Sequence, residues 1–364
     1  MSEVPPRISV IIPCFNYERY VALAIRSALE QTLPPLEVIV VDDGSTDGTA
    51  EVLSGFGDKI KTITQKNAGH VDALNRGYAA CSGDLVLFLD ADDLLLPAAL
   101  ASVAEAWTPG CAATQFELDV IDAAGHPLGR RFCNYVEPYG PAEVRREFSR
   151  FGTYVWPVLS GNVYSRWFLR KLMPLTQEKA PDGVLNTLAP LYGDVQVITR
   201  PLGCYRLHGA NQSYHGTSSG QFAPRFAKQV ELRASELRLL AEHASRLSIR
   251  LPPGDPLDHE LTFVNYRLML KKLGGDYEGA AARRASTLWH SGALAVLRRP
   301  LPLRLKLVHA VWLTALVCSP RWLAYRLIAL RFNRAAPMQS FRGWWAKVSG
   351  TATRKSTIPR GRPF

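Results

Sequence analysis

The first 110 residues alternate short apolar runs with segments of helical periodicity, and this alternation limits the possible folds more than any other feature. The apolar runs are rich in β-branched residues and nearly uninterrupted, as is typical of strands that are buried on both faces. They lie at 8–13, 37–41, 59–64 and 84–89. Helical patterns separate them at 17–31, 46–54 and 70–81, with a further one at 97–107. This order predicts an α/β fold with a mostly parallel, Rossmann-type sheet and flanking helices.

Polar or glycine-containing segments follow the predicted strands. Ligands of such sheets bind beyond the carboxyl ends of the strands. We therefore expect the functional residues within four segments, which are 13–17, 42–45, 65–69 and 90–93.

The segment after the fourth strand holds Asp90, Asp92 and Asp93. Neighbouring carboxylates repel one another unless a cation neutralises them. Mg²⁺ is usually held by one or two carboxylates together with substrate phosphates, so a divalent cation is one interpretation. The other is a polar turn in which Asp93 caps the next helix. Asp42 and Asp43 end the second strand in the same way, and two acidic clusters at one sheet edge favour the functional interpretation.

The rest of the chain has a different pattern. Residues 112–121 and 128–132 predict a β-hairpin, and 195–205 a further strand. Helical patterns are expected near 165–172 and 183–192, and they dominate from about residue 224 onward.

Charge is distributed unevenly along the chain. The sequence has 43 Lys and Arg against 32 Asp and Glu, a net charge of +11, but no acidic residue follows Glu278. Residues 279–364 hold 16 basic residues and five of the eight tryptophans, whereas residues 1–278 carry a net −5. Basic segments rich in Trp and Leu favour the headgroup region of an anionic bilayer, so we expect residues 279–348 to bind a membrane surface. A basic helical packing domain is the alternative. Nucleic acid is not expected, because no binding motif accompanies the charge.

Four segments in order resemble the family 2 glycosyltransferases. They are Ser9-Val-Ile-Ile-Pro-Cys-Phe-Asn-Tyr17, Val40-Val-Asp-Asp-Gly-Ser-Thr-Asp-Gly-Thr49, Asn67 to Gly77, and Gly83-Asp-Leu-Val-Leu-Phe-Leu-Asp-Ala-Asp-Asp93. The resemblance implies a GT-A fold, a nucleotide-sugar donor, inversion at the anomeric carbon and Mn²⁺ or Mg²⁺ as cofactor.

The resemblance also implies site residues. The nucleotide-sugar site would contain Pro13, Phe15, Tyr17, Asp42, Asp43, Asn67, Gly69, Asn75, Asp90, Arg206 and His208. For Phe15 and Tyr17, core packing is an equal alternative. Asp92 would ligate the metal, and Ser160, Gly161 and Asn162 would line the acceptor side. Asp182 would be the general base, with a helix-capping role as the alternative.

These observations divide the chain into a nucleotide-sugar-binding half at 1–110 and an acceptor-binding part at 111–215. A basic helical region at 216–348 and a flexible tail at 349–364 follow. We expect an inverting transferase that moves a sugar, UDP-linked in our interpretation, to a hydroxyl of a cell-surface polysaccharide or lipid-linked glycan. A membrane-associated nucleotide-sugar-binding scaffold without turnover is the alternative. With no signal peptide or membrane span evident, we expect it on the cytoplasmic face of the cell membrane.

Overall fold

The computed structural model describes residues 5–135, 137–176, 181–208, 211, 222–275, 283–298 and 303–332. Its described residues fall into two compact units. The first lies within Met1–Pro127, Arg131–His208 and Gln229–Glu260, and the second within Leu128–Arg130, Gly209–Lys228 and Leu261–Phe364. The stretch 229–260 thus belongs to the first unit, which the predicted boundary at 216 did not anticipate. The predicted tail at 349–364 lies outside the described residues.

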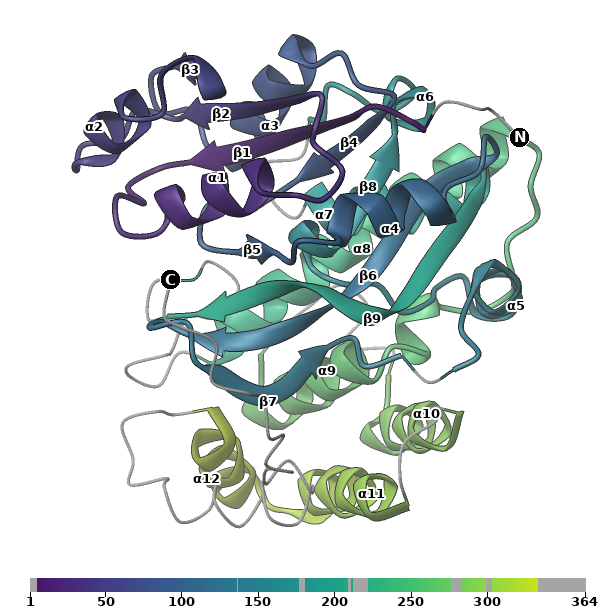
Figure 1. Cartoon of the computed structure of the whole chain (residues 1–364). Helices are drawn as coiled ribbons and strands as arrows, with labels where there is room; N and C mark the ends of the chain where they lie inside the picture. Colours follow the sequence, from purple (N-terminus) through teal and green to yellow (C-terminus); the bar gives the residue numbers. More distant parts are fainter. Residues whose placement is uncertain are drawn as a thin grey trace. The chain divides into compact units, whose positions relative to one another are not determined.

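The amino-terminal half of the first unit is a parallel sheet, as predicted (Figure 1). Its strands are β1 (Ile8–Cys14), β2 (Glu37–Asp42), β3 (Lys61–Thr64) and β4 (Leu85–Phe88), in the order β3-β2-β1-β4. The helices between them are α1 (Val21–Leu29), α2 (Thr49–Ser54) and α3 (His70–Ala80), with a short 3-10 turn at Gly57–Lys59. Because these strands are parallel, their polar carboxyl ends meet at one edge.

Beyond β4 the sheet becomes mixed. The four-residue strand β8 (Asn162–Ser165) pairs antiparallel with both β4 and β6 (Cys111–Asp122). β9 (Asp194–Leu207) runs parallel to β6, and β7 (Pro127–Phe132) forms the predicted hairpin with β6. The two-residue strand β5 (Leu94–Leu95) pairs antiparallel with β9. The α/β fold is confirmed, and β8 is the added strand that joins the predicted parallel half to the rest of the sheet.

The buried strand β1 separates two hydrophobic cores. Ile11 packs with Val71 and Leu74 of α3 on one face, whereas Val10 and Ile12 pack with α1 on the other. Side chains alternate between the faces of a strand, so a strand covered on both sides is apolar throughout. This is the physical reason for the uninterrupted apolar runs in the sequence.

The other helices of the first unit include α5, a helix outside the ranges predicted from the sequence. They are α4 (Ala99–Ala106), α5 (Pro141–Phe151), α6 (Arg166–Leu169), α7 (Pro181–Tyr192) and most of α8 (Phe222–Arg246), with 3-10 turns at Leu159–Gly161 and Pro256–Asp258. Only two residues of the polar helix α5 are buried, so its apolar period is weak. Both ends of α5 carry residues typical of helix ends. Pro141 begins the helix, and the Glu143 side chain accepts a hydrogen bond from the Gly140 amide at 3.0 Å. Gly152 ends it in the left-handed conformation, at φ 68°.

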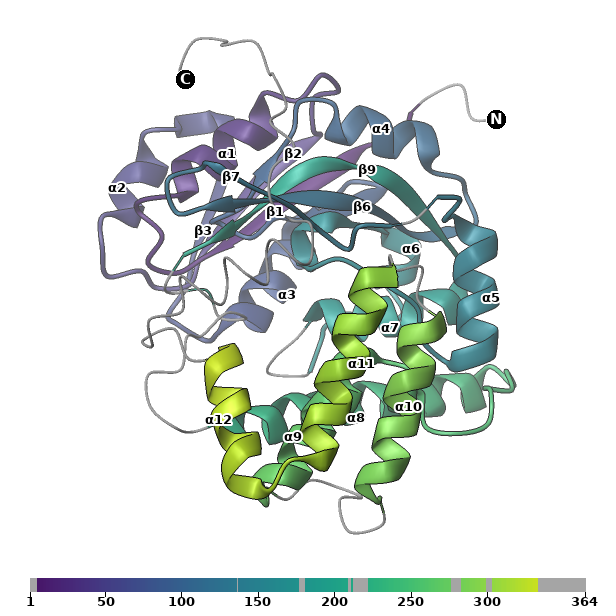
Figure 2. The same cartoon turned by 90° about the horizontal axis from the view of Figure 1, so that it is seen from below.

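The second unit confirms the predicted helical region. Its main helices are α9 (Leu261–Leu273), α10 (Ala285–Arg298), α11 (Leu303–Cys318) and α12 (Arg321–Phe332), and α9 packs against the other three (Figure 2). The indole of Trp312 donates to the Asn265 side chain at 2.9 Å, which joins α11 to α9. Within the described ranges, every helix falls short of the length or the hydropathy that a membrane-spanning segment requires.

The close approach of α3 to β1 gives a test of the fold. A Cβ atom at Gly77 would lie 2.3 Å from Cγ2 of Ile11. We expect Gly77→Ala to lower the free energy of unfolding by about 1–3 kcal/mol, because the core would be overpacked. Gly110→Ala is the matched control, since a Cβ there meets no atom within 4 Å. Urea unfolding of both variants checks this, and equal stability of the two would contradict the packing described.

Candidate active site

The acidic segment after β4 is held by the carboxyl end of β9. Asp92 Oδ2 lies 2.8 Å from His208 Nε2, and each side chain is only 8% exposed. The Tyr17 hydroxyl approaches the same oxygen at 3.4 Å. Asp93 is fully buried, and its Oδ1 accepts from the Arg206 backbone amide at 2.8 Å. Burial, followed by the charges of Asp92 and Asp90, raises the pKa of Asp93 well above its usual value.

The buried side chain of Arg206 holds the segment of Asp92 and Asp93 in place. It is 2% exposed, and its Nε donates to the carbonyl of Asp92 at 2.8 Å. Its guanidinium lies over the ring of Tyr20, 4.9 Å from the centroid. These contacts give Arg206 a clear role in holding the turn of Asp92 and Asp93, while its predicted contact with a diphosphate stays a prediction.

The acidic pair after β2 organises the neighbouring loop. Asp43 accepts hydrogen bonds at 2.8 Å from the Gln65 side chain and from the backbone amides of Ala68 and Gly69. Asp42 accepts from the amide of Ser45 at 3.0 Å. Both carboxylates are buried. Asp43 therefore fixes the loop that presents the exposed Asn67, and this loop lies at the carboxyl edge of the sheet, as predicted.

The loop after β1 contains Phe15 and Tyr17, for which ligand contact and core packing were the two alternatives. Phe15 is 42% exposed, although the adjoining strand residue Pro13 is buried. Core packing therefore does not explain Phe15, and an exposed aromatic ring at this edge is available to a ligand. Tyr17 is partly buried, and burial, followed by the charge of Asp92, raises the pKa of its hydroxyl.

Asp182 lies in the first turn of α7 and is partly buried. Burial, with the nearby charge of Asp90 adding to it, raises the pKa of Asp182 to about 6. Asp90 in turn forms an ion pair with His70, whose Nε2 lies 3.2 Å from its Oδ1. Burial lowers the pKa of His70, but the hydrogen bond to Asp90 and the charges of Asp90, Asp182 and Asp92 together outweigh it, so the net shift is upward. Sequence reasoning missed His70, and its only signal was its place at the start of α3, directly after Gly69.

Four further predicted site residues, Ser160, Gly161, Asn162 and Asn75, make contacts with the backbone around the site. Ser160 and Asn162 are fully buried, and Ser160 Oγ accepts from the Asp90 amide at 3.1 Å. Asn162 donates to the carbonyl of Val158 at 2.7 Å, and a Cβ at Gly161 would lie 2.7 Å from Pro157. The Asn75 side chain exchanges two hydrogen bonds with the backbone of Leu175, at 2.8 and 2.9 Å. The contacts described for these four residues hold backbone in place, and their predicted ligand contacts stay predictions.

The donor set at Asp92 fits a divalent cation that substrate completes. Among the described residues, no three His, Cys, Asp or Glu side chains form a ready metal site. A carboxylate oxygen and an imidazole nitrogen do meet at 2.8 Å. Asp92 and His208 would be the residues of this chain that hold such an ion, together with phosphate oxygens of the substrate.

Comparison with known proteins places this geometry in a family. The family model described as "Glycosyl transferase family 2" matches residues 9–170. An uncharacterized glycosyltransferase of Nostoc sp., alr2836, is 34% identical over an alignment of 222 residues that covers 58% of this chain and 68% of that protein. The chain belongs to the family 2 glycosyltransferases and is an enzyme of this class.

Two further comparisons concern smaller or more distant similarity. Chondroitin synthase of Escherichia coli is 39% identical over 98 residues, which are 26% of this chain and 14% of that protein. The crystal structure of S. aureus TarS 1-349 covers 93% of this chain and 92% of its own, with a TM-score of 0.52 at 17% identity. At that identity the second comparison shows the fold alone.

Proposed function

We propose that the enzyme transfers a sugar, with inversion, from a nucleoside-diphosphate donor to a hydroxyl of a cell-surface polysaccharide or lipid-linked glycan. UDP is the proposed nucleotide. The observation that supports this most directly is Asp182, a partly buried carboxyl whose pKa is raised to about 6 beside the carboxylate of Asp90. A carboxylate that ionises near neutral pH suits general-base catalysis, because it is both ionised and basic at the working pH.

In this proposal Asp182 accepts the proton of the acceptor hydroxyl while the hydroxyl oxygen attacks the anomeric carbon. The bond from that carbon to the diphosphate oxygen breaks on the opposite side, and the nucleoside diphosphate leaves as an anion. Mn²⁺ or Mg²⁺ at Asp92 and His208 would supply positive charge to that leaving group. His70 and Ser160 keep Asp90 in place through its carboxylate and its amide, respectively. The proposed contact surface for the nucleoside consists of Phe15, Asn67 and either Asp42 or Asp43.

The second unit supports the proposed binding to an anionic membrane surface. Leu303, Leu307 and Val311 of α11 are 74%, 58% and 68% exposed and recur every four residues, which places them on one face of the helix. On α12, Trp322 is 62% exposed beside Arg326. Exposed apolar rows flanked only by basic residues are unfavourable in water and favourable at the boundary between headgroups and acyl chains of anionic lipids. Of the predicted membrane segment at 279–348, residues 279–282, 299–302 and 333–348 lie outside the described residues.

Asp182→Asn tests the base. We expect kcat to fall by roughly 10²- to 10⁴-fold while the donor still binds, because general-base catalysis is lost. In the wild type, kcat should fall as pH drops through about 6, since protonated Asp182 cannot accept a proton. Release of nucleoside diphosphate from a panel of UDP-sugars, with glycan acceptors or water, measures both. The exposed Asp58→Asn is the control and should match the wild type. Unchanged turnover of Asp182→Asn would refute the assignment, and donor binding without any turnover would favour the scaffold alternative.

Thermal unfolding with UDP tests the cation site. We expect UDP with Mn²⁺ to raise the melting temperature more than UDP alone, because a ligand that binds only the folded state stabilises it. Asp92→Asn should remove the Mn²⁺-dependent part of the increase, and Asp58→Asn should retain it. An equal response of wild type and Asp92→Asn to Mn²⁺ would place the cation elsewhere.

Vesicle flotation tests the membrane surface with the full chain. Leu307→Glu combined with Val311→Glu should weaken binding to vesicles of anionic phospholipid by at least about tenfold, because a fully buried aliphatic side chain contributes about 1.5–3 kcal/mol. Ser286→Glu with Thr287→Glu, two exposed polar positions of α10, is the control for added charge. The proposal fails if the two double variants float to the same extent, or if the wild type does not float.

A further inference from the structure

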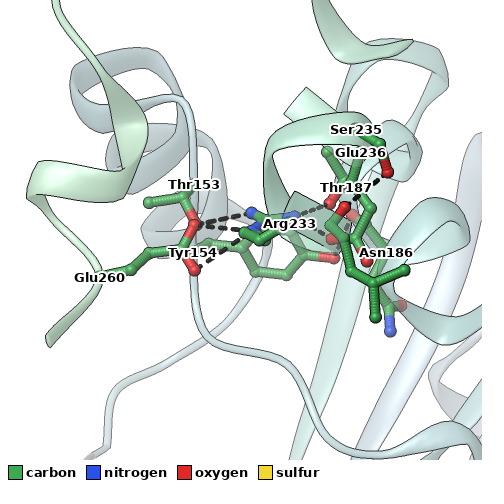
Figure 3. Close-up of polar contacts among 9 residues, drawn as sticks. Thr153, Tyr154, Asn186, Thr187, Arg233, Ser235, Glu236 and Glu260 are labelled. Atoms are coloured by element: carbon green, nitrogen blue, oxygen red, sulfur yellow. Dashed lines mark hydrogen bonds and ion pairs between the residues drawn. The ribbon is translucent and has the colours of Figure 1, made fainter. Parts of the chain in front are cut away.

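A buried arginine lies behind the helix that carries Asp182. Arg233 of α8 is 3% exposed and lies between two carboxylates (Figure 3). Its Nη1 is 2.6 Å from Glu236 Oε2, and its Nη2 is 2.7 Å from Glu260 Oε1. Nη1 also donates to the hydroxyl of Thr187 on α7, and the guanidinium lies over the ring of Trp156 at 4.7 Å. Removing water from the charges of such a buried ion pair costs free energy. A contribution to the stability of the fold therefore does not by itself explain why these three charged residues are buried.

Glu236 packs against the residue that follows Asp182. A Cβ atom at Gly183 would lie 2.0 Å from Glu236 Oε1 and 2.5 Å from its Cδ. Gly183 is not among the glycines with a positive φ, so space rather than backbone conformation requires glycine there. The carboxylate of Glu236 therefore occupies the volume directly behind the first turn of α7.

The next turn of α7 is fixed from the opposite side. Asn186 Oδ1 accepts from the Gln115 side chain at 3.0 Å and from the Tyr164 hydroxyl at 3.1 Å. The Tyr154 hydroxyl donates to the Asn186 carbonyl at 3.0 Å. These groups belong to β6, β8 and the segment after α5, so α7 is held between the sheet and α8.

Asp182 and Glu236 also interact electrostatically. Burial raises the pKa of Glu236 to about 7, Arg233 opposes the increase, and the charge of Asp182 adds to it. The titratable groups that interact electrostatically with Asp182 come from five elements or their ends: Asp90, His70, Tyr164, Tyr205 and Glu236.

We propose that Glu236, held by Arg233, is a positioning residue for Asp182, because it packs against Gly183 and so fixes the first turn of α7. The inference rests on the proposed role of Asp182 as general base. Arg233 fixes Glu236 and, through Thr187, the following turn of the same helix, so one guanidinium sets the distance between α8 and the base.

Glu236→Gln keeps the packing and removes the carboxylate. The glutamine retains the volume beside Gly183 and an oxygen for Arg233, so we expect kcat and the KM for the UDP-sugar to stay within a few fold of the wild type. The pKa of Glu236 is about 7 and that of Asp182 about 6, so Glu236 is mostly protonated where Asp182 ionises, and the acid limb of the kcat–pH profile should stay in place. Glu231→Gln, an exposed carboxyl on the same helix, is the control. A loss of kcat in Glu236→Gln as large as that in Glu236→Ala would overturn the packing role.

Glu236→Ala and Gly183→Ala test the packing. Each single variant should lower kcat by roughly tenfold to a hundredfold with little change in KM, because misplacing a catalytic group by about 1 Å can cost that much. The double variant should lose less than the product of the two single losses, since the alanine methyl at 183 fills the space that Glu236 leaves. Backbone hydrogen exchange in 181–187 should speed up in Glu236→Ala and stay close to the wild type in Glu236→Gln. Multiplicative losses of kcat, or unchanged exchange in Glu236→Ala, would overturn the positioning role.

The outcomes separate this inference from the proposed function. If Asp182→Asn is inactive while Glu236→Ala matches the wild type in kcat and exchange, the positioning role is wrong and the base assignment stands. If Asp182→Asn retains transfer, the base assignment fails and the positioning role fails with it.

Discussion

The concentration of carboxylates at the carboxyl edge of the sheet is the constraint on which the rest of this structure depends. Asp90, Asp92 and Asp93 lie within four residues at the end of a strand that is buried on both faces. Asp92 and Asp93 are buried away from water, so groups of the protein must form hydrogen bonds with their carboxyls. The carboxyl end of β9 supplies these groups: the Arg206 amide donates to the Asp93 carboxyl, and the His208 imidazole meets the Asp92 carboxylate. The mixed half of the sheet thus completes the site.

The other carboxylates near this edge also have hydrogen-bond or ion-pair partners. Asp43 is satisfied by the amides of the loop before α3, so one carboxylate both ends β2 and shapes that loop. Asp90 pairs with His70 at the start of α3. Burial and carboxylate neighbours raise the pKa of both Asp93 and Asp182. Asp93 is fully buried and Asp182 only partly, so of these two carboxyls Asp182 is the one that a substrate can reach.

Much of the fold and part of the site could be predicted from the sequence. The four apolar runs became β1–β4, and the polar residues after them came together at one edge. Short or polar elements were missed: β8 has four residues, and α5 buries only two side chains. His70 gave no periodic or motif signal, so its pairing with Asp90 was invisible. The exposure of Phe15 also required the structure, since a ring in a loop can pack inward or face solvent.

The sequence by itself determined the family, the parallel half of the sheet and the basic, Trp-rich character of the last quarter. These depend on local pattern, motif order and composition, which short stretches of chain record. Only the tertiary structure decided which residues surround Asp182. Arg233 and Glu236 lie about 50 residues further along the chain in a polar helix, and nothing local distinguishes them from surface charges. Packing across long sequence separations made them buried neighbours of the turn that carries Asp182, and charges interact more strongly when they are buried.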